Sequence, residues 1–239
     1  MSKPTSYLVC GTPRTGSTYL CDLLASTGVA GQPESYFREP DQLDWAARFG
    51  VQAAADGTFD YRAFVDGAVR AGASPNGIFA ARIMWGTLDV ILPGLKASPA
   101  RADIDVLSEV FGPLLLVHLH RRDVIAQAVS WARAEQTGYW QQGDAAHGEP
   151  QLHLDQVDGL VRTIREHNAA WSAWFSQQGV QPHVVVYEDL IDDPRGTVLG
   201  ILQRLEVVAP PGWEPRSTHV RQSDGVNRDW VRCYLRARR

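Results

Sequence analysis

A short segment near the start of the chain carries residue types that bind phosphate-like anions. It reads PRTGST over residues 13–18 and follows an apolar stretch. Where such a turn joins a strand to a helix, several backbone N–H groups point at one spot, and the helix dipole adds partial positive charge. Arg14 can donate to two anionic oxygens at once, and the neighbouring hydroxyl groups can donate further hydrogen bonds. The segment therefore predicts an anion site; the alternative is a loop whose glycines serve only a tight turn.

One position of this loop narrows the choice of anion. Ser17 stands where a nucleoside triphosphate loop carries a lysine. That lysine spans the β- and γ-phosphates, and the hydroxyl residue after it holds magnesium. Its absence argues against a triphosphate and against a metal ion at the site, whereas a 5′-phosphosulfate fits. A nucleotide kinase or NTPase with a degenerate loop is the competing hypothesis, which magnesium-dependent ATP binding would reveal.

The segment HRRDVIAQAVS could bind a second anion. Arg121 and Arg122 come where an apolar run ends, and Asp123, Gln127 and Ser130 share one face of the helix expected to follow. An arginine and a serine placed in this way can hold a phosphate together. The alternative is ordinary surface chemistry, in which an exposed arginine pair lies beside a capping aspartate.

The elements that must position these residues follow from the hydrophobic pattern. LLLVHLH at 114–120 is a continuous apolar run, typical of a strand buried on both faces of a parallel sheet. His118 and His120 alternate on this strand and face the same way, either toward a nucleotide or as hydrogen-bonded structural residues. The whole pattern predicts strands at 6–10, 78–85, 114–120 and 183–190. It predicts helices from Ser17 to a cap at Gly28, around 43–49, at 56–72, at 86–110 with a Pro/Gly break and a loop around 98–99, at 123–135, at 153–178 and from Asp193 onward.

Strands that alternate with helices predict an α/β fold with a central parallel sheet flanked by helices. In such sheets, ligands sit beyond the carboxyl ends of the strands. We therefore expect the segments Thr12–Thr18, His118–Arg122 and Tyr187–Asp189 to meet at one edge of the sheet.

Length and composition describe one globular domain over residues 1–239. The net charge of −4 lacks the basic excess of a nucleic-acid-binding surface. Cys10, Cys21 and Cys233 are too few and too scattered for a disulfide framework or a zinc site. No run approaches the ~20 apolar residues that span a bilayer, and no long apolar signal segment opens the chain. These features predict a cytoplasmic protein without a metal cofactor.

The loop and the arginine–serine segment together resemble the sulfotransferases that use 3′-phosphoadenosine-5′-phosphosulfate (PAPS). PRTGST is similar to the core of their phosphosulfate loop, and RRDVIAQAVS is similar to the segment that takes the 3′-phosphate. Further stretches in order, among them IMW, QTGYW and the terminal RQS, narrow the resemblance to the trehalose 2-sulfotransferase family of bacterial carbohydrate sulfotransferases. The resemblance covers most of the chain and implies the P-loop-NTPase-like sulfotransferase fold.

The same resemblance assigns residues to the sulfuryl donor, PAPS. The residues expected to hold the phosphosulfate are Arg14, Thr15, Gly16, Ser17 and Thr18. Arg121 and Ser130 are the expected ligands of the 3′-phosphate, but Arg122 stands where the family commonly has proline, so either arginine could make the contact. Arg221 resembles a basic C-terminal segment that closes over the nucleotide; without the resemblance, it is a solvated basic end.

The family pattern G-x-P-x-E-[aromatic]-F implies a glutamate as catalytic base. This chain reads GQPESYF at 31–37, so Glu34 comes one residue early and Ser35 occupies the glutamate position. We expect Glu34 to take the proton of the acceptor hydroxyl in an in-line transfer, while Arg14 and the loop amides stabilise charge on the leaving phosphate. The alternatives are a different base, with Glu34 a solvated loop carboxylate, and a catalytically inactive sulfonucleotide-binding protein.

The resemblance also implies the acceptor, a hydroxyl group of a carbohydrate or glycolipid, and a homodimer as the assembly. Aromatic side chains can stack on sugar rings, although core packing explains most of them equally well. The candidates are Trp45, Trp85, Tyr36, Phe37 and Trp140.

Overall fold

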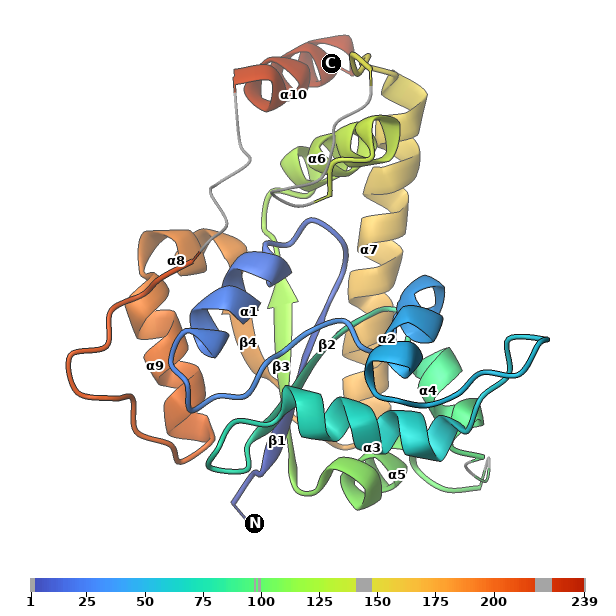
Figure 1. Cartoon of the computed structure of the whole chain (residues 1–239). Helices are drawn as coiled ribbons and strands as arrows, with labels where there is room; N and C mark the ends of the chain where they lie inside the picture. The colour runs from blue at the N-terminus through green and yellow to red at the C-terminus, as the bar shows by residue number, and fades with distance from the viewer. Residues whose placement is uncertain (1–2, 97, 99, 141–147, 218–224, 239) are drawn as a thin grey trace.

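A sheet of parallel strands lies at the centre of the computed structural model (Figure 1). The structure describes residues 3–96, 98, 100–140, 148–217 and 225–238. Its strands follow the order β2-β1-β3-β4 across the sheet. They are β1 (Ser6–Gly11), β2 (Phe79–Met84), β3 (Leu114–His120) and β4 (His183–Val186). β1 pairs with β2 on one side and with β3 on the other, so successive strands are added first to one side of β1 and then to the other. Ligands of open α/β sheets bind at such a reversal of strand order.

Helices separate the strands, as the alternating pattern predicts. The helices of the described residues are α1 (Ser17–Ala25), η1 (Glu39–Asp41), α2 (Gln42–Arg48), α3 (Tyr61–Gly72), α4 (Leu88–Gly94), α5 (Asp103–Phe111), α6 (Val124–Thr137), α7 (Leu154–Gln177), α8 (Tyr187–Asp192), α9 (Pro194–Arg204) and α10 (Gly225–Ala237). The predicted α/β fold with a flanked parallel sheet is therefore confirmed.

Both faces of the sheet are buried, because alternate residues of β1 point to opposite sides. Tyr7 and Val9 pack with apolar residues of α1 and α9, whereas Leu8 and Cys10 pack with α3, α5 and α7. The result is a layer of helices on each side of the sheet (Figure 1). This burial explains why the strands read as continuous apolar runs.

A third apolar cluster lies beyond the carboxyl ends of the strands, where α6, α7 and α10 pack together (Figure 1). It includes Trp131 of α6, Ile164 of α7 and Tyr234 of α10. The Tyr234 hydroxyl donates a hydrogen bond to Asp158, and the Arg133 guanidinium donates one to Asn227 at 2.7 Å. The C-terminal helix is thereby attached to the end of the molecule that carries the predicted loop.

Two predicted elements differ from the structure in where they end, and a third has the break that the sequence predicts. The strand predicted at 183–190 ends at Val186, because the helix α8 begins at Tyr187 with Glu188 and Asp189 in its first turn, where acidic side chains favour the helix dipole. The break predicted within the helical segment 86–110 is confirmed, because α4 ends at Gly94 and α5 begins at Asp103. The first helix ends at Ala25, before the cap predicted at Gly28.

Candidate anion-binding site

The loop between β1 and α1 turns sharply at two residues. Arg14 and Gly16 both have left-handed backbone conformations, with φ of 68° and 81°. Gly16 is the N-cap of α1 and supplies no side-chain hydrogen bond, so the positive end of the helix dipole is not masked by a capping carboxylate or hydroxyl. The Thr15 hydroxyl donates to the carbonyl oxygen of Thr12 at 2.9 Å and closes the turn from inside.

The helix α6 holds this loop at two points. Arg14 Nε donates a hydrogen bond to Ser130 Oγ at 3.0 Å, and Gln127 Nε2 donates one to the carbonyl oxygen of Pro13 at 2.8 Å. The Arg14 guanidinium also donates to the carbonyl oxygen of Trp140, just after α6. The loop and the arginine–serine segment therefore meet, as the sequence predicted.

The helix α7 supports the loop from another side. Trp171, a fully buried residue, donates from its indole N–H to the carbonyl oxygen of Gly11 at 2.9 Å. The Thr12 hydroxyl donates to the side-chain oxygen of Asn168 at 3.1 Å. These bonds fix the end of β1, so the loop starts from a rigid point.

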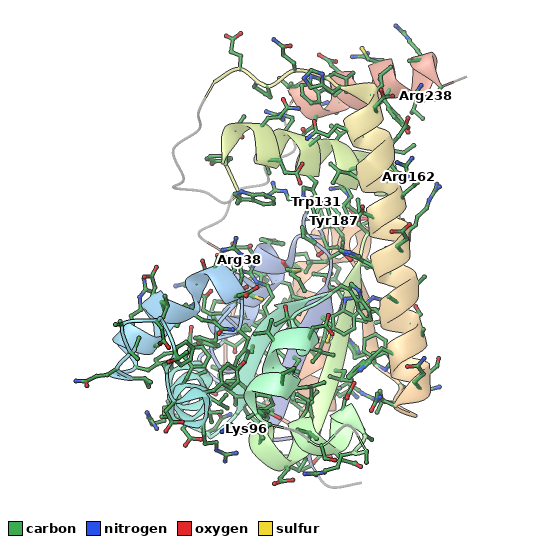
Figure 2. The ribbon with its side chains drawn as sticks, turned by 90° about the vertical axis from the view of Figure 1, so that its right-hand side faces the viewer. Arg38, Lys96, Trp131, Arg162, Tyr187 and Arg238 are labelled. Atoms are coloured by element: carbon green, nitrogen blue, oxygen red, sulfur yellow. The ribbon has the colours of Figure 1, made fainter. Side chains whose placement is uncertain are left out.

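Tyr187, the first residue of α8, forms one wall of the site. A Cβ atom placed on Gly16 would lie 2.5 Å from Cδ2 of the Tyr187 ring, so the ring packs directly on the loop backbone. The Arg121 guanidinium lies over the same ring, 4.6 Å from its centroid. Figure 2 shows Tyr187 at the end of the sheet that α6 covers. All three segments expected at this edge are thus brought together.

The two adjacent arginines have different surroundings. The Arg121 side chain is 15% exposed, and its Nε atom is buried without a hydrogen-bond partner in the described structure. Arg122 is 57% exposed and donates to both carboxylate oxygens of Asp189 at 2.6 Å. Since Arg122 is already paired at the surface, Arg121 is the better placed of the two to bind an anion.

A carboxylate moderates the charge of Arg121. Glu188 Oε1 lies 3.8 Å from Arg121 Nε. Burial alone would raise the pKa of Glu188, but hydrogen bonds from the backbone amides of Arg122 and Asp123, together with Arg121, lower it below its usual value. Glu188 is therefore ionised at neutral pH and holds the start of α6 in place.

Arg82, a charged residue in the otherwise apolar strand β2, belongs to none of the motifs found in the sequence. Its Nη1 donates to the Thr18 hydroxyl at 2.6 Å and its Nε donates to the Ser35 hydroxyl at 2.8 Å. Its backbone N–H donates to the carbonyl oxygen of Glu34 at 2.9 Å. Arg82 therefore ties the segment that carries the expected base to the anion-binding loop. A charge between Ala81 and Ile83 was the signal that could have revealed it.

The remaining predicted residues differ in their exposure. Glu34 is exposed and forms a parallel bridge with Ala81, which places it beside β2. Ser17 is buried at the start of α1. Arg221 lies outside the described residues. Tyr36 and Phe37 are core residues, whereas Trp140 is 42% exposed next to Arg14.

Two further aromatic candidates and His118 pack against other aromatic rings. Trp85 makes an edge contact with Trp171, and Trp45 stacks on Phe49. His118 is buried with its ring against Phe175, and burial, with a smaller contribution from His120, lowers its pKa to about 4. His118 is therefore neutral at pH 7.

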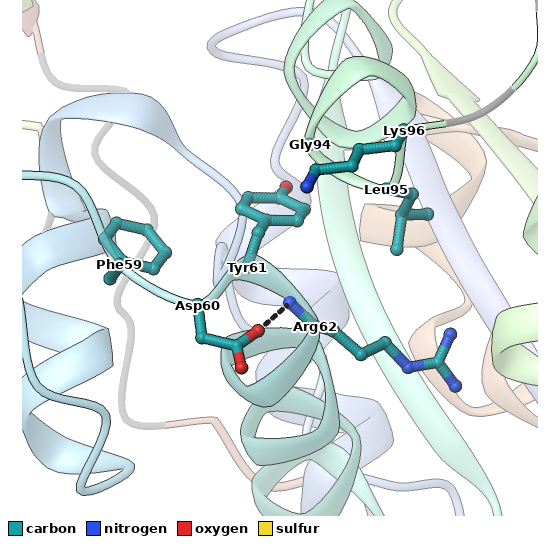
Figure 3. Close-up of a pocket in the computed structure, with 7 residues that line it drawn as sticks. All are labelled: Phe59, Asp60, Tyr61, Arg62, Gly94, Leu95 and Lys96. Carbon is teal, nitrogen blue, oxygen red and sulfur yellow. Dashed lines mark hydrogen bonds between the residues drawn. The ribbon is translucent and has the colours of Figure 1, made fainter.

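A pocket of about 440 Å³ lies between the start of α3 and the end of α4 (Figure 3). Figure 2 shows Lys96, in the wall of this pocket, near the bottom of the molecule and Tyr187 near its middle. The pocket is lined by Phe59, Asp60, Tyr61, Arg62, Gly94, Leu95 and Lys96. It shares no residue with the anion site. Within the described ranges, no three His, Cys, Asp or Glu side chains gather as metal ligands, and no helix has the length and apolarity needed to cross a membrane.

Comparison with known proteins identifies the class that this fold and loop define. The family model described as Stf0 sulphotransferase matches residues 6–237. The chain therefore belongs to the Stf0 sulphotransferase family. It is 29% identical to the trehalose 2-sulfotransferase of Mycolicibacterium smegmatis, over 98% of this chain and 95% of that protein. It is 28% identical to the trehalose 2-sulfotransferase of Mycobacterium tuberculosis strain Erdman, over 95% of this chain and 93% of that protein.

A solved structure, the sulfotransferase domain of the olefin synthase of Synechococcus PCC 7002, aligns with 98% of this chain and 96% of that chain. The TM-score is 0.41 and the sequence identity is 14%. The fold is assigned from the strand order of the chain itself.

Proposed function

We propose that this sulfotransferase moves a sulfuryl group from PAPS to a hydroxyl group of a carbohydrate or glycolipid acceptor, and that residues 1–239 act as one domain. Family membership supports the reaction class, and the names of the two trehalose 2-sulfotransferases support a sugar hydroxyl as acceptor. A cytoplasmic location, a homodimer and the absence of a metal cofactor stay predictions.

The observation that carries this proposal is the hydrogen bond from Arg14 Nε to Ser130 Oγ at 3.0 Å. It makes the phosphosulfate loop and the expected 3′-phosphate segment neighbours in space. PAPS carries a 5′-phosphosulfate and a 3′-phosphate on one ribose, so a single donor molecule can reach both. A triphosphate chain has no second anionic group on the ribose that would use Ser130 and Arg121.

The described residues also fit the donor chemically. Arg121 offers a buried N–H group without a hydrogen-bond partner, which suits a phosphate oxygen. The left-handed turn at Gly16 and the uncapped start of α1 suit a second tetrahedral anion. We assign the 3′-phosphate to Arg121 and Ser130, and the phosphosulfate to the loop residues from Arg14 to Thr18.

PAPS supplies the sulfuryl group for an in-line transfer. Glu34 accepts the proton of the acceptor hydroxyl, because a carboxylate can act as a general base and this one is exposed beside β2. Arg14 and the loop amides stabilise the negative charge that develops on the departing phosphate. Arg122 is assigned to the surface, where it is paired with Asp189.

A second candidate function is a sulfonucleotide-binding protein without transfer activity. The observation that favours it is Ser35, which occupies the family's glutamate position and here accepts a hydrogen bond from Arg82. Binding of adenosine 3′,5′-bisphosphate (PAP), without transfer to any acceptor, would support this function.

Two measurements test the proposal. Calorimetry on the purified protein should detect binding of PAP, and radiolabelled PAPS should transfer its label to at least one acceptor among trehalose, other sugars and lipid extracts. If neither PAP nor PAPS binds, the proposal is wrong. Magnesium-dependent binding of ATP, without binding of PAP or PAPS, would support the hypothesis of a nucleotide kinase or NTPase.

A further inference from the structure

We propose that Arg82 binds the sulfuryl group of the donor, as a contact separate from the loop residues that hold the phosphate. The proposal rests on the function proposed above and assigns a residue that neither the loop motif nor the base motif contains. It starts from the charge of Arg82, its position on β2 and its two hydrogen-bond partners.

The first step concerns the charge. Arg82 is half-buried, and within the described structure it forms no ion pair with a carboxylate. Its two side-chain hydrogen bonds go to the neutral hydroxyl groups of Thr18 and Ser35. A neutral hydroxyl orients a guanidinium but does not compensate its charge, and partial burial of an uncompensated charge costs free energy. A bound anion would supply the missing charge.

The second step concerns the number of donors. A guanidinium has five N–H groups. The two hydrogen bonds to hydroxyl groups hold Arg82 in one orientation, and its other side-chain N–H groups make no hydrogen bond in the described structure. An oriented guanidinium with donors still available is suited to the oxygens of a tetrahedral anion.

The third step concerns position. Val9 of β1 is the partner of Arg82 in the sheet, and both side chains lie on the face that α1 covers. On that face, Thr18 belongs to the phosphosulfate loop, while Ser35 follows the expected base, Glu34. The Arg82 guanidinium therefore lies between the group that holds the donor and the group that activates the acceptor. During transfer, the S–O bond to phosphate breaks as the bond to the acceptor oxygen forms. The sulfuryl group must therefore pass from the phosphosulfate loop toward the acceptor oxygen that Glu34 activates.

The electrostatic reach of Arg82 is consistent with this position. Burial raises the pKa of Cys21, on α1, to about 12, and the charge of Arg82 acts in the opposite direction while that of Glu34 adds to the rise. The charges of Arg82 and Glu34 therefore both act on Cys21, in the helix that follows the loop.

The test compares two ligands that differ only in the sulfuryl group. In Arg82→Gln, the amide can still donate to a hydroxyl but has no charge, so we expect PAPS affinity to fall about 10- to 100-fold, the usual size of a charge-assisted contact. PAP, which lacks the sulfuryl group, should bind within about threefold of the unmodified protein. Arg82→Lys keeps the charge and should lose less PAPS affinity than Arg82→Gln.

The control is Arg101→Gln, because Arg101 is an exposed arginine paired with Glu109 at 2.7 Å, in the segment before α5. Its affinities for both ligands should be unchanged. If Arg82→Gln weakens PAPS and PAP equally, or weakens neither, Arg82 only holds the two segments together and the inference is wrong. If Arg82→Gln does not fold, the same comparison is made on Arg82→Lys, where an unchanged ratio of the two affinities would overturn the inference. Failure of the unmodified protein to bind either ligand would instead reject the proposed function.

Discussion

Tyr187 packs on the backbone of Gly16 so closely that no side chain fits at residue 16. Gly16 also has a φ of 81°, a conformation that costs an L-residue with a Cβ about 1–2 kcal/mol. We expect Gly16→Ala to displace either the loop or Tyr187, and to weaken PAP binding by at least about tenfold. Calorimetry measures the loss.

A matched control exists for this substitution at the other end of α1. Gly28 has a φ of 67°, but a Cβ there would meet no atom within 4 Å. Gly28→Ala therefore imposes a similar backbone strain without the contact with Tyr187. It should lower thermal stability and leave PAP affinity unchanged. Equal losses of affinity in both variants would show that the contact with Tyr187 does not matter.

The unequal surroundings of Arg121 and Arg122 lead to a second prediction. Arg121→Gln should lower PAP affinity about 10- to 100-fold, because it removes a charge-assisted contact from a partly buried site. Arg122→Gln should change it by less than about threefold, because exposed ion pairs contribute little. Adenosine 5′-phosphate, which lacks the 3′-phosphate, gives the specific readout: Arg121→Gln should bind PAP and adenosine 5′-phosphate with similar affinity. A larger loss in Arg122→Gln would reverse the assignment.

The role of Glu34 is tested through turnover. Glu34→Gln should lower kcat about 10²- to 10⁴-fold, the usual contribution of general-base catalysis. PAP affinity should be unchanged, because Glu34 lies outside the loop. The control is Glu39→Gln, an exposed glutamate in the next segment, which should keep normal turnover. Near-normal turnover in Glu34→Gln would assign the proton transfer to another group.

The buried His118 predicts a pH dependence of stability. Its pKa in the folded protein is about 4, below its usual 6.5, so the unfolded chain binds more protons between these values. Its contribution is complete above pH 6.5 and is lost as the pH falls toward 4, by up to about 1.4 kcal/mol per pH unit. His118→Gln should therefore lose less stability than the unmodified protein between pH 7 and pH 5, as measured by urea unfolding.

Because other groups titrate over the same range, the comparison needs a second variant. His153 is exposed, so His153→Gln should keep the pH dependence of the unmodified protein. If the two variants respond alike, burial of His118 does not cause the effect.

The sequence predicted the strands and the loop because local signals determine them: apolar runs, a glycine turn and a helical stripe. The meeting of the three segments also followed, since parallel strands bring their carboxyl ends to one edge. Tyr187 and Arg82 could not be predicted in the same way. Their partners, Gly16 and Thr18, are remote in sequence, and only the packing of α8 and β2 brings them together. The choice between Arg121 and Arg122 likewise depends on Asp189, whose position follows from α8.

The pairing of β1 also sets an order of events during synthesis on the ribosome. Ser6 of β1 pairs with Phe79 and Leu114, so the first strand has no neighbour until β2 has left the exit tunnel, and only one neighbour until β3 follows. The loop acquires its supports later still, when Ser130 and Trp171 emerge. A nascent chain stopped before residue 171 would therefore lack the Trp171 support of the loop and would expose the apolar residues of the sheet that α7 covers.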